Sequence, residues 1–201
     1  MPSVYDLKPK FQNLLRPLMR GLARAGVTPN AVTLAALAGS IAVGASLTQA
    51  AARPWLLLLL PGWLLARMAL NALDGMMARE LRQASALGAV LNELGDVISD
   101  ASLYLPLAWL DPSFLWPVVL FNLGALLTEF CGVLCQALQA GRRYDGPLGK
   151  SDRALLVGAL ALLTFFIPSL WRWWPVVFWL AAALTALTCL NRLRHALRAS
   201  A

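Results

Sequence analysis

The chain has 201 residues, of which 59% are hydrophobic and only 13% are charged. This composition excludes an ordinary soluble domain and is typical of an integral membrane protein. The formal net charge is +7, but the basic residues are dispersed among the ends of apolar segments, so no nucleic-acid partner is predicted. About six spans of roughly 20 residues each leave no room for a second sizeable domain. We therefore predict one membrane domain over residues 1–201.

The first predicted element is a helix over residues 5–25. Its apolar positions recur at helical spacing and are Phe11, Leu14, Leu15, Leu18 and Leu22. Basic residues lie between them, which predicts an amphipathic juxtamembrane helix on an anionic membrane surface, with a plain basic leader as the alternative. Gly26 is expected to end this helix, and Thr28 and Pro29 are expected to begin the next.

Six apolar segments follow, and their lengths suit membrane spans. They cover about residues 31–50, 55–79, 88–110, 114–140, 152–168 and 173–193. The predicted fold is therefore all-α, with six transmembrane helices in a bundle over about residues 31–193 behind the amphipathic helix.

The basic residues are divided unequally between the two sides of this bundle. Fourteen lysines and arginines fall on the side of both termini, whereas only Arg53 and Arg172 fall on the other. Because segments rich in Lys and Arg stay in the cytoplasm, both termini of this multi-pass protein are predicted to be cytoplasmic. Tryptophans at the opposite ends are expected to form an interfacial belt. They are Trp55, Trp109, Trp116, Trp171, Trp173 and Trp174.

One polar segment lies between the second and third spans. Asn71 and Asp74 are three residues apart, and Asn92, Asp96 and Asp100 recur every four, so each set shares a helix face. Carboxylates at such positions are costly unless they are paired, hydrated or bound to a cation. Oxygen ligands without sulfur or histidine suit a hard cation, which is Mg²⁺, Mn²⁺ or Ca²⁺.

This pattern predicts phosphoryl chemistry. A cation held there would bridge a pyrophosphate, and a remaining carboxylate could accept a proton from an attacking hydroxyl. Gly75 and Gly88 would let a bulky ligand approach the backbone. Arg67 lies four residues before Asn71 and shares its helix face, so it is expected to point inward and to pair with Glu129.

The same segment resembles the CDP-alcohol phosphatidyltransferase signature, D-x2-D-G-x2-A-R-x8-G-x3-D-x3-D. The residues identical to it at the right spacing are Asp74, Gly75, Ala78, Arg79, Gly88 and Asp96. The segments VTPNAVTL and GPLGKSDRA resemble the family as well, so the similarity covers nearly the whole chain. The resemblance implies a phospholipid-synthesising enzyme of a bacterial inner membrane. Such an enzyme moves a phosphatidyl group from CDP-diacylglycerol, or a related CDP-lipid, to an alcohol and releases CMP.

Two positions depart from the signature, because Asn71 and Asn92 stand where the family has its first and third aspartates. The metal ligands that the resemblance implies, for Mg²⁺ or Mn²⁺, are Asn71, Asp74, Asn92 and Asp96. An asparagine oxygen can bind a cation but brings no charge, so the metal affinity and the number of metal ions are open questions. Glu93 and Asp100 are the candidates to restore the missing charge.

The resemblance also implies roles for individual residues. Asp74 and Asp96 are the catalytic candidates, and Asp96 is the candidate base for the acceptor hydroxyl. The predicted nucleotide site consists of Gly75, Ala78, Arg79 and Gly88. The predicted acceptor site consists of Lys150, Arg153 and Arg143, which would suit a phosphorylated alcohol. The alternatives are an interfacial charge for Arg79 and simple topology signals for the acceptor residues.

The partners implied are membrane lipids, the CDP-lipid donor, a small alcohol acceptor and a second copy of the chain in a homodimer. The acceptor alcohol is left open, with phosphorylated alcohols among the candidates. Two other functions remain as alternatives. The asparagines suggest a degenerate, non-catalytic protein that binds CDP-lipid or phospholipid, and the acidic segment suggests a small transporter.

Overall fold

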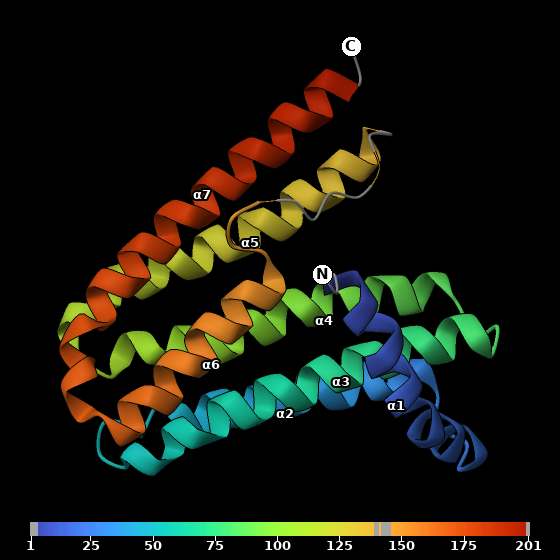
Figure 1. Ribbon diagram of the computed structural model, residues 1–201, viewed down its shortest axis with the longest axis horizontal. Coiled ribbons are helices and arrows are strands. Elements are labelled where there is room, and N and C mark those ends of the chain that lie inside the picture. The colour runs from blue at the N-terminus through green and yellow to red at the C-terminus, as the bar shows by residue number, and fades with distance from the viewer. Residues whose placement is uncertain (1–3, 139–140, 142–145, 200–201) are drawn as a thin grey trace. The chain divides into compact units, whose positions relative to one another are not determined.

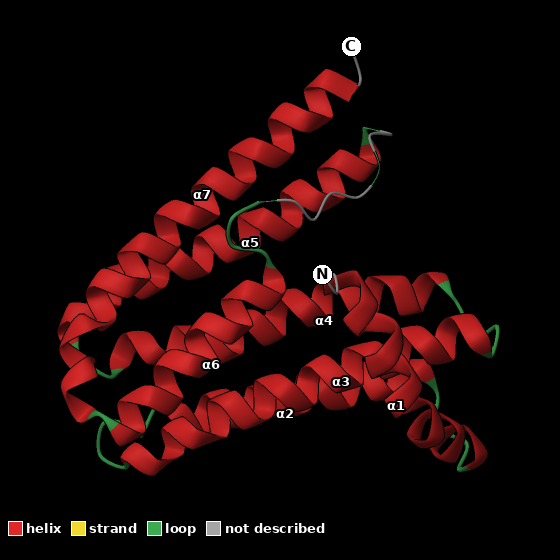
Figure 2. Ribbon diagram, viewed as in Figure 1, coloured by secondary structure: helices red, strands yellow, loops and turns green. Residues whose placement is uncertain are grey.

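The computed structural model describes residues 4–138, 141 and 146–199, and every regular element among them is a helix (Figures 1 and 2). The long helices are α1 (Val4–Arg24), α2 (Pro29–Leu47), α3 (Leu59–Glu80), α4 (Ala86–Tyr104), α5 (Leu115–Ala137), α6 (Lys150–Phe166) and α7 (Trp174–Ala199). Short 3-10 helices join them, namely η1 (Pro54–Leu58), η2 (Leu105–Trp109), η3 (Pro112–Phe114) and η4 (Pro168–Trp173). The prediction of an all-α fold is confirmed.

Among the described residues, four helical stretches are long and apolar enough to cross a membrane. They are Pro29–Leu47, Pro54–Glu80, Pro112–Ala137 and Pro168–Arg198. The segments predicted as the third and fifth spans are helical too, as α4 and α6. However, α4 carries Glu93, Asp96 and Asp100, and α6 has only 17 residues and begins with charged side chains. Six transmembrane helices therefore stay a prediction.

The junction between α1 and α2 has the structure that its sequence predicts. Gly26 adopts a left-handed backbone with a φ of 77°, and the N–H of Val27 donates to the carbonyl of Leu22 at 3.0 Å. This arrangement closes α1 in the way that glycine allows. The hydroxyl of Thr28 then accepts a hydrogen bond from the N–H of Ala31 at 3.2 Å and caps α2.

The chain divides into two compact units, and α2, α3 and α4 each contribute residues to both. The first unit comprises Met1–Ser40 and Leu65–Ser99, and the second comprises Ile41–Leu64 and Asp100–Ala201. Each unit has its own cluster of buried hydrophobic residues.

In the first unit, α1 crosses α3 (Figure 1). Their shared core with α2 contains Leu15, Met19, Val32, Leu73, Met76 and Met77. On another side of α1, Leu14 and Leu18 are 75% and 52% exposed. The helix thus presents apolar side chains both to the core of its unit and outward.

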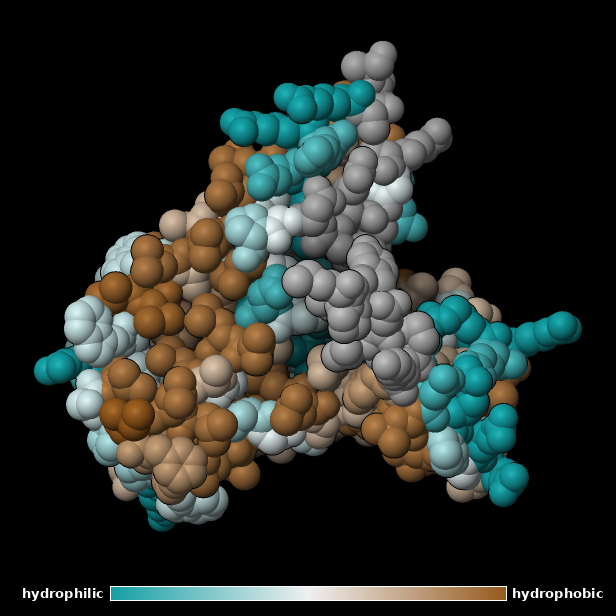
Figure 3. Space-filling model, in the orientation of Figure 1, coloured by the Kyte–Doolittle hydropathy of each residue, from teal (hydrophilic) through white to brown (hydrophobic). Residues whose placement is uncertain are grey.

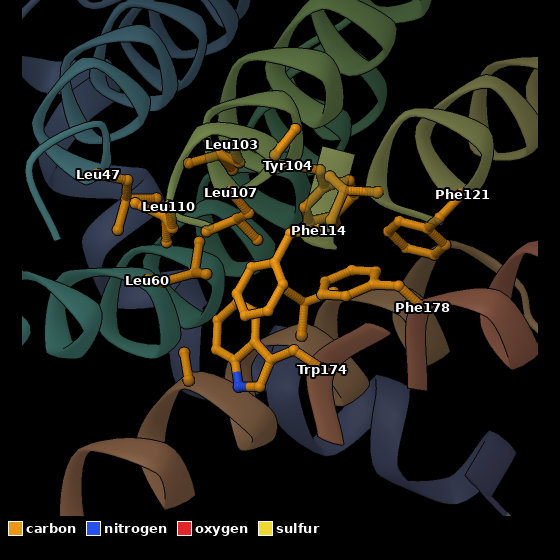
Figure 4. Packing of buried hydrophobic residues seen from close by; sticks show 14 of the residues in the cluster. Leu47, Leu60, Leu103, Tyr104, Leu107, Leu110, Phe114, Phe121, Trp174 and Phe178 are labelled. Atoms are coloured by element: carbon orange, nitrogen blue, oxygen red, sulfur yellow. The ribbon is translucent and has the colours of Figure 1, made fainter. Parts of the chain in front are cut away.

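The core of the second unit is rich in aromatic residues (Figure 4). Phe114 stacks on Trp174 with ring centroids 5.4 Å apart, and Phe121 contacts Phe178 edge to face. The indole N–H of Trp174 donates to Thr164 at 2.9 Å, so this large side chain is buried without an unsatisfied polar group. These rings hold α5, α6 and α7 together with η3.

The burial of Trp174 contradicts its predicted place in an interfacial belt, because its side chain is 0% exposed. Four other belt tryptophans are exposed, namely Trp55, Trp109, Trp116 and Trp173. Neighbouring tryptophans at the start of a helix face different directions, and composition alone does not tell which of them turns into the core.

Apolar side chains also dominate much of the visible surface, whereas hydrophilic side chains gather toward the C-terminal end of α7 (Figure 3). In the second unit, for example, Leu155, Phe166 and Leu180 are 73%, 70% and 62% exposed. Such a surface needs an apolar surrounding, which a bilayer provides.

Close packing at Gly44 gives a testable prediction about stability. A Cβ at this position would lie well inside van der Waals contact with the backbone oxygen of Ser102, which cannot move without shifting α4. We expect Gly44→Ala to lower the free energy of unfolding by about 1–3 kcal/mol.

The matched control is Gly62→Ala in α3, where no atom lies within 4 Å of the added Cβ. The control should instead gain about 0.5–1 kcal/mol. Equilibrium unfolding in detergent, followed by circular dichroism, measures both, and equal effects would contradict the predicted packing.

Candidate active site

Seven residues of the predicted site line one pocket in the first unit. The pocket has a volume of about 320 Å³, which lies within the range of small-molecule sites. The seven residues are Asn71, Asp74, Gly75, Ala78, Arg79, Gly88 and Asn92. Further wall comes from the start of α2 and from the α3–α4 turn, namely from Pro29, Asn30, Thr33, Gln83, Ala84, Ser85 and Ala89. The structure thus brings both predicted asparagines and the predicted nucleotide residues to one cavity.

The turn between α3 and α4 positions both halves of the signature. Arg82 follows α3 with a left-handed φ of 54°, an uncommon value for a residue with a side chain. The hydroxyl of Ser85 then accepts a hydrogen bond from the N–H of Gly88 at 3.0 Å and caps the first turn of α4. The last turns of α3 and the first turns of α4 consequently line the same pocket.

Gly88 lies where no larger residue fits without a shift of its neighbours. A Cβ at this position would come within 2.9 Å of Asn30 Oδ1 and 3.1 Å of Ser85 Oγ. At Gly75 the nearest atom is Nη1 of Arg79, at 3.2 Å, and this flexible side chain can move. A side chain at position 88 would therefore require Asn30 and Ser85 to move.

Asp74 is the carboxylate of the pocket wall. It is buried, and its Oδ2 accepts a hydrogen bond from the hydroxyl of Thr33 at 2.7 Å. Thr33 belongs to the segment VTPNAVTL, which the sequence singles out as a whole without assigning a role to this residue. One signal could have indicated this role. The hydroxyl lies one helical turn after Asn30, on a helix that starts at the site.

Asp96 is held by two donors from α3. Its Oδ1 accepts from Asn71 Nδ2 at 2.9 Å and from Arg67 Nη2 at 3.2 Å. The same guanidinium nitrogen donates to the backbone carbonyl of Asp96 at 3.0 Å. Arg67 is only 4% exposed, which confirms that it points inward. Sequence reasoning treated Asn71 as a metal ligand and did not foresee it as a hydrogen-bond donor to the candidate base.

The donor set fits a hard cation, but with less charge than four carboxylates would provide. No group of three or more His, Cys, Asp or Glu side chains suited to a metal occurs in the described part of the chain. At the signature positions of the pocket wall, the side-chain oxygens are those of one carboxylate, Asp74, and of two amides, Asn71 and Asn92. Carboxylate and amide oxygens are ligands that Mg²⁺ and Mn²⁺ accept.

Of the two acids that could restore charge, neither lines this pocket. Glu93 is half-buried on α4. Asp100 belongs to the second unit, is 3% exposed and forms an ion pair with Arg153 at 3.3 Å. Their compensating role stays a prediction.

The predicted acceptor residue Arg153 lies at the centre of a buried network in the second unit. Its side chain is 0% exposed, and Nη2 donates to Glu129 at 2.7 Å as well as to Asp100. Its Nη1 donates to the hydroxyl of Thr128 at 2.8 Å. The backbone oxygen of Thr128 in turn accepts from the guanidinium of Arg192. The sequence predicted Arg67 as the partner of Glu129 and gave no sign that Arg153 pairs with Glu129 and Asp100.

The other two predicted acceptor residues are placed differently. Lys150 is half-buried at the start of α6, next to Gly149, whose N–H donates to the carboxylate of Asp152 at 2.9 Å. Arg143 lies outside the described residues.

Comparison with known proteins decides the family. A sequence model described as CDP-alcohol phosphatidyltransferase matches residues 26–190, which include the pocket and Arg153 with its two carboxylate partners. The chain belongs to the CDP-alcohol phosphatidyltransferase family. The resemblance of the signature is thereby confirmed.

Two relatives show how far the similarity extends. The chain is 50% identical to the inner membrane protein YnbA of Escherichia coli (strain K12), over 99% of this chain and 98% of the relative. It is 30% identical to the phosphatidylinositol phosphate synthase of Mycobacterium tuberculosis (strain ATCC 25618 / H37Rv), over 91% of this chain and 85% of the relative.

Solved structures of the Mycobacterium tuberculosis phosphatidylinositol phosphate synthase are similar in fold. The one with CDP-DAG bound superposes with a TM-score of 0.76 at 26% identity and covers 90% of this chain and 92% of that one. The complex with manganese and citrate gives a TM-score of 0.76 at 25% identity and covers 90% and 88%.

This member of the CDP-alcohol phosphatidyltransferase family is an enzyme of phospholipid synthesis. It transfers a phosphatidyl group from a CDP-linked lipid to an alcohol and releases CMP. The predicted activity and enzyme class are thus confirmed. The roles of individual residues stay predictions.

Proposed function

We propose that the donor of this phosphatidyltransferase is CDP-diacylglycerol and that its CDP group binds in the pocket of the first unit, with Mg²⁺ or Mn²⁺. The observation that carries the proposal is that seven signature positions line this one pocket. The solved relatives support it, because one has CDP-DAG bound and another has manganese.

We infer that the cation is held by oxygens of Asp74, Asn71 and Asn92, with Asp96 beside them on α4. A divalent cation there would supply positive charge to the pyrophosphate of CDP-diacylglycerol, from which CMP leaves. Gly75 and Gly88 leave room for the nucleotide, and Arg79 offers it a guanidinium at the pocket wall. Here Ala78 serves as a small wall residue.

Asp96 is the proposed base. The hydrogen bonds from Arg67 and Asn71 fix one oxygen of its carboxylate. A carboxylate held in this way can accept a proton from the alcohol. Its second oxygen, Oδ2, would accept that proton. Positioning by two donors keeps the carboxylate from rotating away.

The acceptor is proposed to be a small alcohol that approaches Lys150, Arg153 and Arg143. A phosphorylated alcohol is the first candidate, because several relatives are phosphatidylinositol phosphate synthases. Lys150 and Arg143 would then bind the phosphate, since Glu129 and Asp100 already offset the charge of Arg153.

For the membrane arrangement, we propose a single inner-membrane domain with six spans, cytoplasmic termini and α1 at the interface. The inner-membrane relative and the four apolar stretches support the location. The exposed Leu14 and Leu18 support an α1 that rests in lipid headgroups. The distribution of Lys and Arg supports the orientation, and a homodimer is proposed from the family resemblance.

A CMP-release assay tests the proposed donor and base. We expect the purified protein in lipid, given CDP-diacylglycerol and Mg²⁺ or Mn²⁺, to release CMP only when a suitable alcohol from a panel of neutral and phosphorylated polyols is present.

Asp96→Asn keeps an acceptor oxygen for Arg67 and Asn71 but removes the base, so the rate should fall by about 10²-fold or more. Thermal unfolding of the variant controls for its fold. Full activity of Asp96→Asn would exclude Asp96 as the base. If no mixture that contains CDP-diacylglycerol released CMP, CDP-diacylglycerol would be excluded as the donor.

A further inference from the structure

Arg67 and Asp96 form a partly buried ion pair beside the pocket. Neither residue lines the pocket, but Asn71, which does, donates to Asp96. The side chains of Arg67 and Asp96 are 5% and 19% exposed. One guanidinium nitrogen binds both the carboxylate and the backbone carbonyl of Asp96, at 3.2 and 3.0 Å. A guanidinium is always charged, so this positive charge is a fixed part of the site.

Asn71 complements that ion pair. Its amide N–H donates to the oxygen of Asp96 that also accepts from Arg67, at 2.9 Å. An aspartate at position 71 has no proton to donate when ionised, and it would bring a second negative charge to about the same distance from Asp96. The amide at position 71 is therefore matched to an Asp96 that pairs with arginine.

The charges around the pocket point the same way. Asp74 is the carboxylate among the lining residues, and Arg79 is a cation in the same wall. Two divalent cations repel each other four times as strongly as two unit charges at the same distance, so a two-metal site needs several carboxylates. This site instead has amides at positions 71 and 92 and an arginine on Asp96.

We propose that this site binds a single divalent cation, through Asp74 and the amide oxygens, and that Arg67 supplies to Asp96 the positive charge that a second cation would otherwise provide. The inference rests on the proposed function, because it concerns the metal of the same site. It assigns Arg67 as a positioning and charge-balancing residue that the signature does not contain.

The number of bound Mn²⁺ ions tests the inference without any need for turnover. The full chain in detergent is titrated with Mn²⁺, and electron paramagnetic resonance measures the free ion. The unmodified chain should bind one Mn²⁺, and Asp74→Asn should weaken that binding at least tenfold. Binding that persists unchanged in Asp74→Asn is adventitious and is subtracted. Two ions per unmodified chain, or none, would overturn the proposal.

A pair of variants isolates the role of Arg67. The variant Asn71→Asp with Asn92→Asp restores four carboxylates and keeps Arg67, whereas adding Arg67→Met removes the fixed cation. We expect the triple variant to bind a second Mn²⁺ at least tenfold more tightly than the double variant. Equal affinity for the second ion would overturn the role of Arg67.

Folding and turnover are followed in the same preparations. Thermal unfolding checks each variant, and if the triple variant does not fold, the ion count of the unmodified chain still decides the single-cation proposal. CMP release is measured alongside. Two bound ions in an active enzyme would overturn this inference alone. If the chain showed no bound Mn²⁺ and no CMP release, the proposed function would be overturned as well.

Discussion

Asp74→Asn is expected to lower the rate of CMP release by about 10³-fold or more, which corresponds to about 4 kcal/mol of transition-state stabilisation. Asp74 is the carboxylate of the pocket wall, so its loss removes the charge that best binds a cation. The replacement is nearly isosteric, and its amide oxygen can still accept the hydrogen bond from Thr33. Steady-state assays with CDP-diacylglycerol over a range of Mn²⁺ concentrations measure the effect.

The matched control for this prediction is Asp111→Asn. Asp111 undergoes the same chemical change but caps η3 in the second unit, where it accepts from the N–H and hydroxyl of Ser113 at 2.8 and 2.7 Å. Its activity should stay within about twofold of the unmodified enzyme, because surface changes have small effects. Activity of Asp74→Asn above one tenth of normal would show that the pocket carboxylate is dispensable.

Arg153→Met is expected to have the largest effect on stability, with a loss of about 3–5 kcal/mol in the free energy of unfolding. The reason is that Glu129 and Asp100 would both lose the guanidinium that offsets their charge in a buried position. Unfolding in detergent, followed by circular dichroism, measures the loss. By the usual scaling for a chain of this size, the melting temperature should fall by about 10 °C.

Two further variants separate charge from packing at Arg153. Adding Asp100→Asn and Glu129→Gln to Arg153→Met removes all three charges, and most of the lost stability should return because no buried charge is left uncompensated. Arg198→Met removes an exposed cation of α7 and should cost less than about 0.5 kcal/mol. If the triple variant is as unstable as Arg153→Met, the loss comes from packing and the charge argument is wrong.

The structure of the site was predictable where local rules decide it. The spacing of Asn71 and Asp74 on one helix, and of Asn92 and Asp96 on the next, follows from helical periodicity alone. The turn between them is short, so both pairs had to lie near each other, and seven signature positions do line one pocket. Gly26 ends α1 and Thr28 caps α2, and both were predictable because their contacts are with residues close by in the chain.

The ion pairs were not predictable in the same way. Arg67 is 29 residues from Asp96, and Arg153 is 53 residues from Asp100. Which carboxylate meets which guanidinium depends on helix rotation and packing, and neither has a signal in a single sequence. The same holds for Trp174, whose burial depends on Phe114 and Thr164 in other elements.

By itself, the sequence determined the all-α membrane class, the helix boundaries near Gly26 and the family signature, because hydropathy, capping and spacing act over a few residues. Only the tertiary structure decided that Asn71 donates to Asp96, that Arg67 shares this carboxylate and that Thr33 holds Asp74. These contacts join separate helices. The surroundings of the two asparagines at positions 71 and 92, which replace charged residues, are therefore known only once those helices are packed together.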